Sequence, residues 1–465
     1  MSPAAASDEL HIAMFPWFAF GHISPFVQLS NKLALHGVRI SFLTAPGNIP
    51  RIKSSLLLTP KTQIISLPIP PVEGLPPGLD STSEMTPAMA EALKKALDLM
   101  QPQVKTLLSQ LKPHLVVFDF AQYWVPKIAS ELGVKSLQFS VYSAVSGGYL
   151  IVPVRTSGNK NPTVEDLMKP PEGFPSTSIV SVERFQAENF LYVYKSFDGS
   201  PSVYSRSLEI IRDCDAIIIK TCNELEGPYV DHMRTQYQKQ ILLSGPLVPE
   251  PPSGQLEERW AKWLDQFPSK SVVYCSFGSE TFLSDDQIRE LSLGLELTGL
   301  PFFLVLNFPP DFNNKDAKLA GVLPQGFQER VKDRGIVHTG WVQQQLILAH
   351  DSVGCYFCHS GFSSVIEAFI NDCQLVLLPL KGDQFLNSKL IAGDMKAGVE
   401  VNRRGEDGYF GREDVSDAVK TLMVDIDKDP CMSLRANHRK WGEFLQNGEI
   451  QAKFIANLVE ELKAL

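Results

Sequence analysis

Short apolar runs alternate with helical patterns along almost the whole chain of 465 residues. The runs are nearly continuous in Val, Ile, Leu and Phe, which is typical of parallel strands covered by helices on both faces. The alternation therefore predicts an α/β protein with doubly wound parallel sheets. The predicted strands are 11–17, 38–45, 63–69, 114–120 and 134–140, followed by 271–277, 302–307, 335–341, 354–359 and 375–379.

A break near the middle of the chain divides this alternation into two series. Residues 246–256 are rich in Pro, Gly and Ser, which is typical of a linker between domains. We expect one Rossmann-like domain over 1–245 and a second over 257–440. The two would face a cleft in which ligands lie at the carboxyl ends of the strands. The amphipathic segment 441–465 predicts a terminal helix.

Composition argues against several classes of protein. The net charge of −9 and the lack of basic clusters argue against a nucleic-acid partner. The N-terminus lacks the pattern of a secretory signal, and the uncharged stretch 136–154 is too rich in polar residues to predict a membrane span. Seven scattered cysteines in such a chain are expected to be reduced and buried, so we predict a cytoplasmic protein.

The stretch "CYFCHSGFSS" at 355–364 allows several interpretations. C-x-x-C-H is the spacing of covalent haem attachment. A strand, a small-residue turn and a helix opening at Ser363 or Ser364 would instead point N–H groups at a phosphate. A capping box between Ser364 and Glu367 would give the same pattern without any ligand. No second Cys or His pair completes a zinc site with these cysteines.

A longer pattern runs from Trp341 to Gln384. Over 44 positions it reads W…Q…H…H-x-G…S-x-x-E…P…DQ. It resembles the plant secondary-product box of the UDP-sugar-dependent glycosyltransferases. The resemblance extends over the full chain, including "FPWFAFGHISP", "FDFAQYW", "VVYCSFGS" and "SGPLVPEP". It is nearest to the branch that adds a second sugar to flavonoid or anthocyanin 3-O-glucosides.

This resemblance implies the GT-B architecture, in which two Rossmann-like domains face a cleft and the last helix crosses back onto the first domain. A helix packed on its own domain is the alternative. A UDP-sugar would be the co-substrate, and no metal and no other cofactor is expected. The usual motifs of nicotinamide, flavin and P-loop enzymes and the G-x-S-x-G elbow are absent, which agrees with this interpretation. We expect a monomer.

The resemblance also implies a donor site in the second domain. It implies that Trp341, Val342 and Gln344 contact the uracil and that Glu367 contacts the ribose. The pyrophosphate would be bound by Ser279, His359, Ser363 and Ser364. The sugar would be contacted by Ser140, Asp383 and Gln384. The family commonly has H-C-G-W-N-S where this chain has H-S-G-F-S-S around Gly361, so Phe362 replaces a tryptophan and Ser363 an asparagine. These changes leave the donor sugar open among glucose, rhamnose and xylose.

Catalysis is expected on the other side of the cleft. The resemblance assigns the general base to His22, at the turn into the first predicted helix, and its orientation to Asp119, which ends a predicted strand. A histidine is suited to remove the proton of an attacking hydroxyl, and a single inverting displacement at the anomeric carbon would follow. Taken alone, His22 is as well explained by a buried or helix-start histidine, and Asp119 by a turn residue.

Aromatic residues of the first domain are candidates for stacking on a flat acceptor. They are Phe18, Phe20, Phe120, Tyr123, Trp124 and Tyr142. Each could equally be an ordinary core residue. The expected function is transfer of a sugar to a flavonoid-type glycoside. The alternatives are transfer directly to an aglycone hydroxyl, a non-catalytic nucleotide-sugar-binding protein, and a haem protein.

Overall fold

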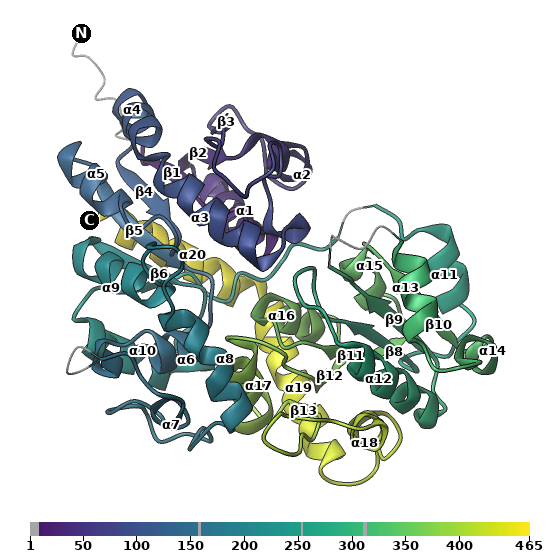
Figure 1. Cartoon of the computed structure of the whole chain (residues 1–465). Helices are drawn as coiled ribbons and strands as arrows, with labels where there is room; N and C mark the ends of the chain where they lie inside the picture. Colours follow the sequence, from purple (N-terminus) through teal and green to yellow (C-terminus); the bar gives the residue numbers. More distant parts are fainter. Residues whose placement is uncertain (1–8, 157–159, 253, 310–313) are drawn as a thin grey trace.

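The computed structural model describes residues 9–156, 160–252, 254–309 and 314–465. They form two α/β halves, one drawn from purple to teal and the other from green to yellow in Figure 1. Each half is built on a parallel sheet with the strand order of a doubly wound fold, β3-β2-β1-β4-β5-β6-β7 in the first and β10-β9-β8-β11-β12-β13 in the second. The predicted fold class is confirmed.

All ten predicted strands are present, with ends that shift by at most three residues. The strands of the first sheet are β1 (His11–Phe15), β2 (Arg39–Thr44), β3 (Thr62–Ser66), β4 (Leu115–Phe118), β5 (Lys135–Ser140), β6 (Ala216–Ile219) and β7 (Ile241–Leu243). Those of the second are β8 (Val272–Ser276), β9 (Phe302–Leu306), β10 (Gly335–Thr339), β11 (Val353–Cys358), β12 (Gln374–Leu377) and β13 (Gly398–Glu400). Sequence reasoning missed β6, β7 and β13, because three or four residues give too short a pattern.

Helices connect the strands in both halves. The first half contains α1 (Phe20–Leu35), α2 (Ile49–Lys53), α3 (Pro87–Asp98), α4 (Gln101–Leu111), α5 (Val125–Glu131), α6 (Ala144–Leu150), α7 (Val164–Leu167), α8 (Arg184–Tyr194), α9 (Val203–Asp213) and α10 (Asn223–Tyr237). The second contains α11 (Glu258–Leu264), α12 (Asp285–Thr298), α13 (Lys315–Val322), α14 (Phe327–Val331), α15 (Gln344–Leu348), α16 (Phe362–Ile370), α17 (Gln384–Lys389), α18 (Arg412–Met423), α19 (Cys431–Gln446) and α20 (Gly448–Lys463).

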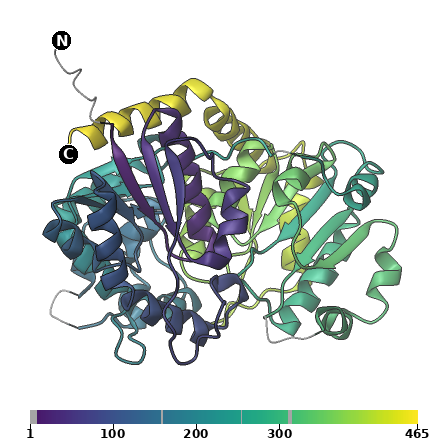
Figure 2. The ribbon, with the colours of Figure 1, turned by 90° about the horizontal axis from the view of Figure 1, so that it is seen from above.

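The last helix returns to the first half of the molecule. Figure 2 shows α20, in yellow, lying along the first sheet and far from most of the second. Its buried residues Ile455, Leu458 and Leu462 belong to the same core cluster as Ile12 of β1 and Leu242 of β7. Burial of this apolar face holds the two halves together through a second connection besides the segment between β7 and α11.

The cysteines of "CYFCHSGFSS" lie on opposite faces of the second sheet. Side chains alternate along β11, so Cys355 packs into one core cluster and Cys358 into the other. All seven cysteines are free and buried. Two cysteines on opposite faces cannot attach one haem, so the haem interpretation is wrong.

The stretch 136–154 forms most of β5 followed by α6. In the described part of the chain, no helix has both the length and the apolar character needed to cross a membrane.

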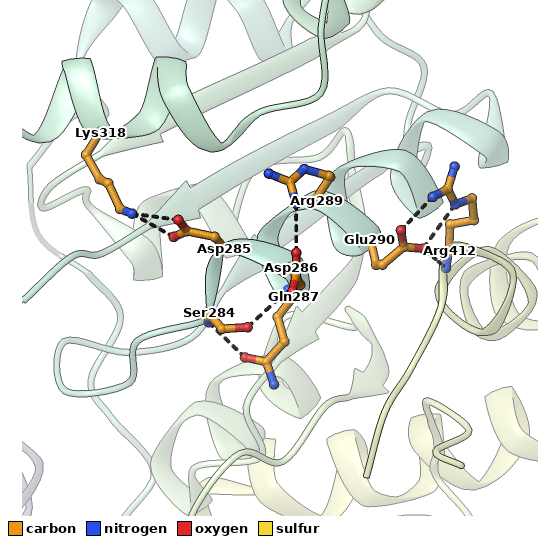
Figure 3. Close-up of polar contacts among 8 residues, drawn as sticks. All are labelled: Ser284, Asp285, Asp286, Gln287, Arg289, Glu290, Lys318 and Arg412. Atoms are coloured by element: carbon orange, nitrogen blue, oxygen red, sulfur yellow. Dashed lines mark hydrogen bonds and ion pairs between the residues drawn. The ribbon is translucent and has the colours of Figure 1, made fainter. Parts of the chain in front are cut away.

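Polar contacts define the start of α12 and its contact with α18 (Figure 3). Ser284 accepts a hydrogen bond from the Gln287 N–H at 3.2 Å, and the Gln287 side chain accepts one from the Ser284 N–H at 2.9 Å. This reciprocal pair is a capping box, with Ser284 as the N-cap. Further along the helix, the Glu290 carboxylate accepts hydrogen bonds from the backbone N–H and the side chain of Arg412.

Gly294 allows α12 and α18 to approach closely. A Cβ added there would lie 2.5 Å from Val415 Cβ and 2.8 Å from the Arg412 carbonyl oxygen. We expect Gly294→Ala to destabilise the fold by roughly 1–3 kcal/mol, although Ala normally stabilises a helix relative to Gly. Gly321 in α13 has no atom within 4 Å of such a Cβ. Thermal unfolding should therefore show a lower Tm for Gly294→Ala and an equal or higher Tm for Gly321→Ala; the same sign for both would contradict this account.

Candidate active site

The first functional pair lies at the carboxyl ends of β1 and β4, which are neighbours in the sheet. His22 lies in the first turn of α1 and Asp119 follows β4, and the His22 Nδ1 is 2.8 Å from the Asp119 Oδ2. The Asp119 carboxylate also accepts hydrogen bonds from the backbone N–H groups of Trp17 at 3.2 Å and Phe120 at 2.7 Å. These bonds fix the carboxylate, so Nδ1 is the nitrogen that carries the proton and Nε2 is the free base.

The surroundings of His22 tune its basicity. Burial works against the protonated form, yet the Asp119 carboxylate, with weaker attraction from Glu280 and Asp383, raises the pKa of His22 above its ordinary value. The Tyr142 hydroxyl lies 3.3 Å from Nε2, and burial raises the pKa of Tyr142 well above its ordinary value, so this hydroxyl keeps its proton. The site thus stabilises an imidazolium once a proton has been taken up.

Two of the six aromatic residues proposed for the acceptor lie beside His22. The rings of Phe120 and Tyr142 are 5.4 and 5.3 Å from its imidazole.

The other four aromatic residues have partners elsewhere. Phe18 is fully buried and Trp124 is 5% exposed, and both pack in the core near Phe15. Phe20 lies 3.5 Å from the Arg51 guanidinium carbon, and the guanidinium of Arg206 lies over Tyr123 at 4.6 Å. Phe18 and Trp124 therefore expose almost no surface on which an acceptor could stack.

On the facing side, His359 fits between two glycines. A Cβ at Gly278 would lie 3.0 Å from the imidazole, and one at Gly361 would lie 2.7 Å from Nε2. Gly278 also has a φ of +75°, a conformation that favours glycine. Burial lowers the pKa of His359 to about 4, helped by the positive Lys381, so the ring is neutral. Among the described residues, its buried Nδ1 has no hydrogen-bond partner.

The turn after His359 leads directly into α16. The helix begins at Phe362 with Gly361 as its N-cap, one or two residues earlier than the predicted start at Ser363 or Ser364. The capping box between Ser364 and Glu367 does not form, because Glu367 lies in the second turn and accepts hydrogen bonds from Gln344 and Gln345. The N–H groups of the first helical turn therefore lack side-chain caps and are available to an anion.

The residues expected at the base and ribose lie around this helix. Trp341 is 70% exposed and Val342 is buried, while Ser279, which is expected at the pyrophosphate, is exposed. The Gln344 side chain donates to Glu367 at 2.8 Å and accepts from the Tyr356 hydroxyl at 3.0 Å. The exposed indole of Trp341 offers a large open face on which a flat base could stack.

Asp383 and Gln384, expected at the donor sugar, differ in what their side chains do. Gln384 is 6% exposed, and its side-chain oxygen accepts hydrogen bonds from the backbone N–H groups of Leu380 and Lys381. The Asp383 carboxylate accepts from Asn387 at 3.0 Å, and burial raises its pKa. Gln384 therefore orders the loop, while Asp383 lies within electrostatic reach of His22.

Phe362 and Ser140 complete the predicted donor set. Phe362 is 6% exposed and packs in the core, so its side chain is part of the hydrophobic cluster. Ser140 ends β5 and is half-buried. Its carbonyl oxygen accepts the backbone N–H of Lys220.

Sequence reasoning missed the residues that join the two halves at this site. Lys220, after β6, donates from Nζ to the Ser363 hydroxyl at 2.6 Å, and the Ser143 hydroxyl donates to the Asn387 side-chain oxygen at 2.5 Å. Thr82 donates to Glu280 at 2.5 Å. The signal for Lys220 was a charged residue directly after the apolar run "AIII". Nothing comparable marked Asn387, because its role depends on contacts across the halves.

No group of three or more His, Cys, Asp or Glu side chains in the described ranges gathers as a metal site.

Two doubly wound domains, with a His–Asp pair in one and an open helix N-terminus in the other, match the GT-B architecture that the sequence resemblance implies. Residues 263–441 match the family model of UDP-glucoronosyl and UDP-glucosyl transferase. Anthocyanidin-3-O-glucoside rhamnosyltransferase of Petunia hybrida is 60% identical over 461 residues, covering 99% of this chain and 97% of that protein. The chain therefore belongs to the UDP-glycosyltransferase family, and it is a UDP-dependent glycosyltransferase.

Two further comparisons bear on its class. Cyanidin 3-O-galactoside 2''-O-xylosyltransferase of Actinidia chinensis var. chinensis is 42% identical over 461 residues, covering 99% of both chains. The crystal structure of Arabidopsis thaliana UGT89C1 complexed with UDP-L-rhamnose superposes with a TM-score of 0.75 at 23% identity, covering 98% of this chain and 100% of that one. This structural likeness supports the fold.

A substitution at Gly361 tests how His359 is packed. We expect Gly361→Ala to push the imidazole out of its position, because the new Cβ would lie within 2.7 Å of Nε2. Loss of one hydrogen bond to a charged ligand corresponds to about a 10- to 100-fold weaker affinity for UDP. Isothermal titration calorimetry measures this Kd, and Gly321→Ala is the control. Unchanged UDP binding by Gly361→Ala would contradict the assigned position of His359.

Proposed function

We propose that this enzyme transfers a sugar from a UDP-sugar to a sugar hydroxyl of a flavonoid-type glycoside, with inversion at the anomeric carbon. The observation that carries the chemistry is the His22–Asp119 pair, in which Asp119 holds Nδ1 and Nε2 lies on the side of Tyr142, with the Phe120 ring also beside the imidazole. The acceptor class is supported by relatives whose names specify 3-O-glucosides and 3-O-galactosides of anthocyanidins.

In this mechanism, His22 Nε2 takes the proton of the acceptor hydroxyl as the oxygen attacks the anomeric carbon. Asp119 holds the ring by Nδ1 and stabilises the imidazolium that forms. The bond between the anomeric carbon and the phosphate oxygen breaks in the same displacement, and UDP leaves with an added negative charge. The first turn of α16 and neutral His359 supply hydrogen-bond donors for that charge.

The donor residues keep the roles that the resemblance implies, with one refinement. Trp341 stacks on uracil, with Val342 and Gln344 completing base recognition, and Glu367 binds the ribose. Ser279, His359, Ser363 and Ser364 bind the pyrophosphate, and Asp383 and Ser140 contact the sugar. Gln384 acts through the loop that its side chain orders. We further propose that the enzyme is a cytoplasmic, metal-independent monomer, for which chelation by EDTA without loss of activity and size-exclusion chromatography are the tests.

The basicity of His22 gives a pH prediction. A base must be deprotonated to act, so kcat/KM should fall as the pH falls through the raised pKa of His22. Asp119→Asn removes the charge that raises this pKa, so the acid limb should move to lower pH while the rate falls by about 10²- to 10⁴-fold. His22→Ala should abolish transfer and leave the Kd for UDP unchanged. An acid limb that stays in place in Asp119→Asn would contradict the assignment.

The acceptor and the donor are tested together in a panel. UDP-rhamnose, UDP-xylose, UDP-glucose and UDP-galactose are each combined with a flavonoid aglycone and its 3-O-glucoside, and products are resolved by mass spectrometry. We expect product with the glucoside only and the highest kcat/KM with UDP-rhamnose, because the name of the 60% identical Petunia relative specifies transfer of rhamnose. Products on aglycone alone would replace the glycoside proposal by direct transfer to an aglycone hydroxyl. Binding of UDP without any product would favour a nucleotide-sugar-binding protein.

A further inference from the structure

Lys220 is a buried cation that crosses from the first half of the molecule to the second. It follows β6, and its backbone N–H is held by the Ser140 carbonyl oxygen at 3.1 Å. Its side chain extends to the first turn of α16, where Nζ donates to the Ser363 hydroxyl at 2.6 Å. The residue is only 1% exposed. The acceptor-side domain thus places a positive charge beside the helix end at which the donor site is built.

The charge of Lys220 is poorly compensated by the protein. Burial lowers the pKa of its ammonium to about 8, and the attraction of Glu367 offsets only part of this effect. No carboxylate of the described residues forms an ion pair with it, and the Glu367 oxygens accept from Gln344 and Gln345. An ammonium has three N–H donors, of which Ser363 takes one. A buried cation with so little compensation is costly unless a further anion is supplied.

Other polar groups close to Ser363 also lack hydrogen-bond partners that an anion could supply. The first turn of α16 has no acidic side chain, and its N-cap Gly361 offers no side-chain acceptor to the free N–H groups. The buried Nδ1 of neutral His359 has no partner among the described residues. The imidazole lies against Gly361 and the ammonium against Ser363, so both groups flank the first turn of α16, and all three features favour negative charge.

We propose that Lys220 is a donor-binding residue contributed by the N-terminal domain, and that its ammonium binds a diphosphate oxygen of the UDP-sugar beside Ser363. This inference rests on the proposed function, because it takes a nucleotide diphosphate as the anion. As the glycosidic bond to phosphate breaks, the charge on UDP increases, and the ammonium stabilises that increase. The diphosphate then links the two domains, so donor binding and domain contact support each other.

The test distinguishes a contact with the diphosphate from a contact with the nucleoside. Lys220→Met keeps the length and apolar character of the side chain and removes its charge, while Lys220→Arg restores a cation. Isothermal titration calorimetry compares UDP with uridine, which has the same base and ribose without phosphate. The matched control is Lys239→Met, because Lys239 only donates to the carbonyl oxygens of Arg212 and Cys214 at the end of α9.

We expect Lys220→Met to raise the Kd for UDP by at least tenfold and to leave the Kd for uridine within twofold. Lys220→Arg should recover at least part of the UDP affinity, and Lys239→Met should leave both values unchanged. A residue that merely fastens the domains would give equal losses for UDP and uridine, and that result, or an unchanged UDP affinity, would overturn the proposal. Melting temperatures of all variants show whether each is folded.

The same measurements distinguish this inference from the proposed function. A wild-type enzyme that binds UDP with the Lys220 dependence but transfers no sugar to flavonoid glycosides would keep the role of Lys220 and remove the acceptor assignment. A wild-type enzyme that binds no UDP would overturn both. Transfer to the glycoside with Lys220→Met at the wild-type KM for the UDP-sugar would overturn the role of Lys220 alone.

Discussion

The site depends on the way the carboxyl ends of two parallel sheets are held against each other. In a parallel sheet these ends all meet at one edge, so residues far apart in sequence, such as His22 and Asp119, become neighbours. Polar contacts then join the two edges. The Ser143 hydroxyl on one side donates to Asn387 on the other, and Asn387 also donates to the Ser360 carbonyl oxygen and to Asp383. Asn387 thereby fixes the turn before α16 against the first half of the molecule.

That turn has little freedom, and its restriction accounts for the residue types found in it. Ser360 has a φ of +66°, which is uncommon for a residue with a side chain, and its carbonyl oxygen is held by Asn387. Gly278 and Gly361 leave the space that His359 occupies. The H-x-G element and the glycine after β8 are therefore one packing unit, although they are separated by about 80 residues in the chain.

Sequence reasoning captured the fold because long apolar strands and their alternation with helices survive without tertiary information. It failed for β6, whose pattern covers only four residues, and with β6 it missed Lys220 directly after the strand. It also allowed a capping box at Ser364, because the spacing to Glu367 is right, whereas α16 starts one or two residues earlier than predicted and Glu367 accepts a hydrogen bond from Gln344. The acceptor aromatics show a related limit, since hydrophobic character alone does not separate Phe18 in the core from Tyr142 at His22.

In the proposed mechanism, the charges around the site match the charges that the reaction forms. Asp119, with Glu280 and Asp383 as weaker contributors, favours the protonated form of His22, the form produced if His22 takes the proton of the hydroxyl. Neutral His359, the start of α16 and buried Lys220 favour an anion, the form in which UDP would leave. The proposed reaction creates one positive and one negative charge. Each arises where the fold has already placed opposite charge or hydrogen-bond donors, so little reorganisation is needed as the bond breaks.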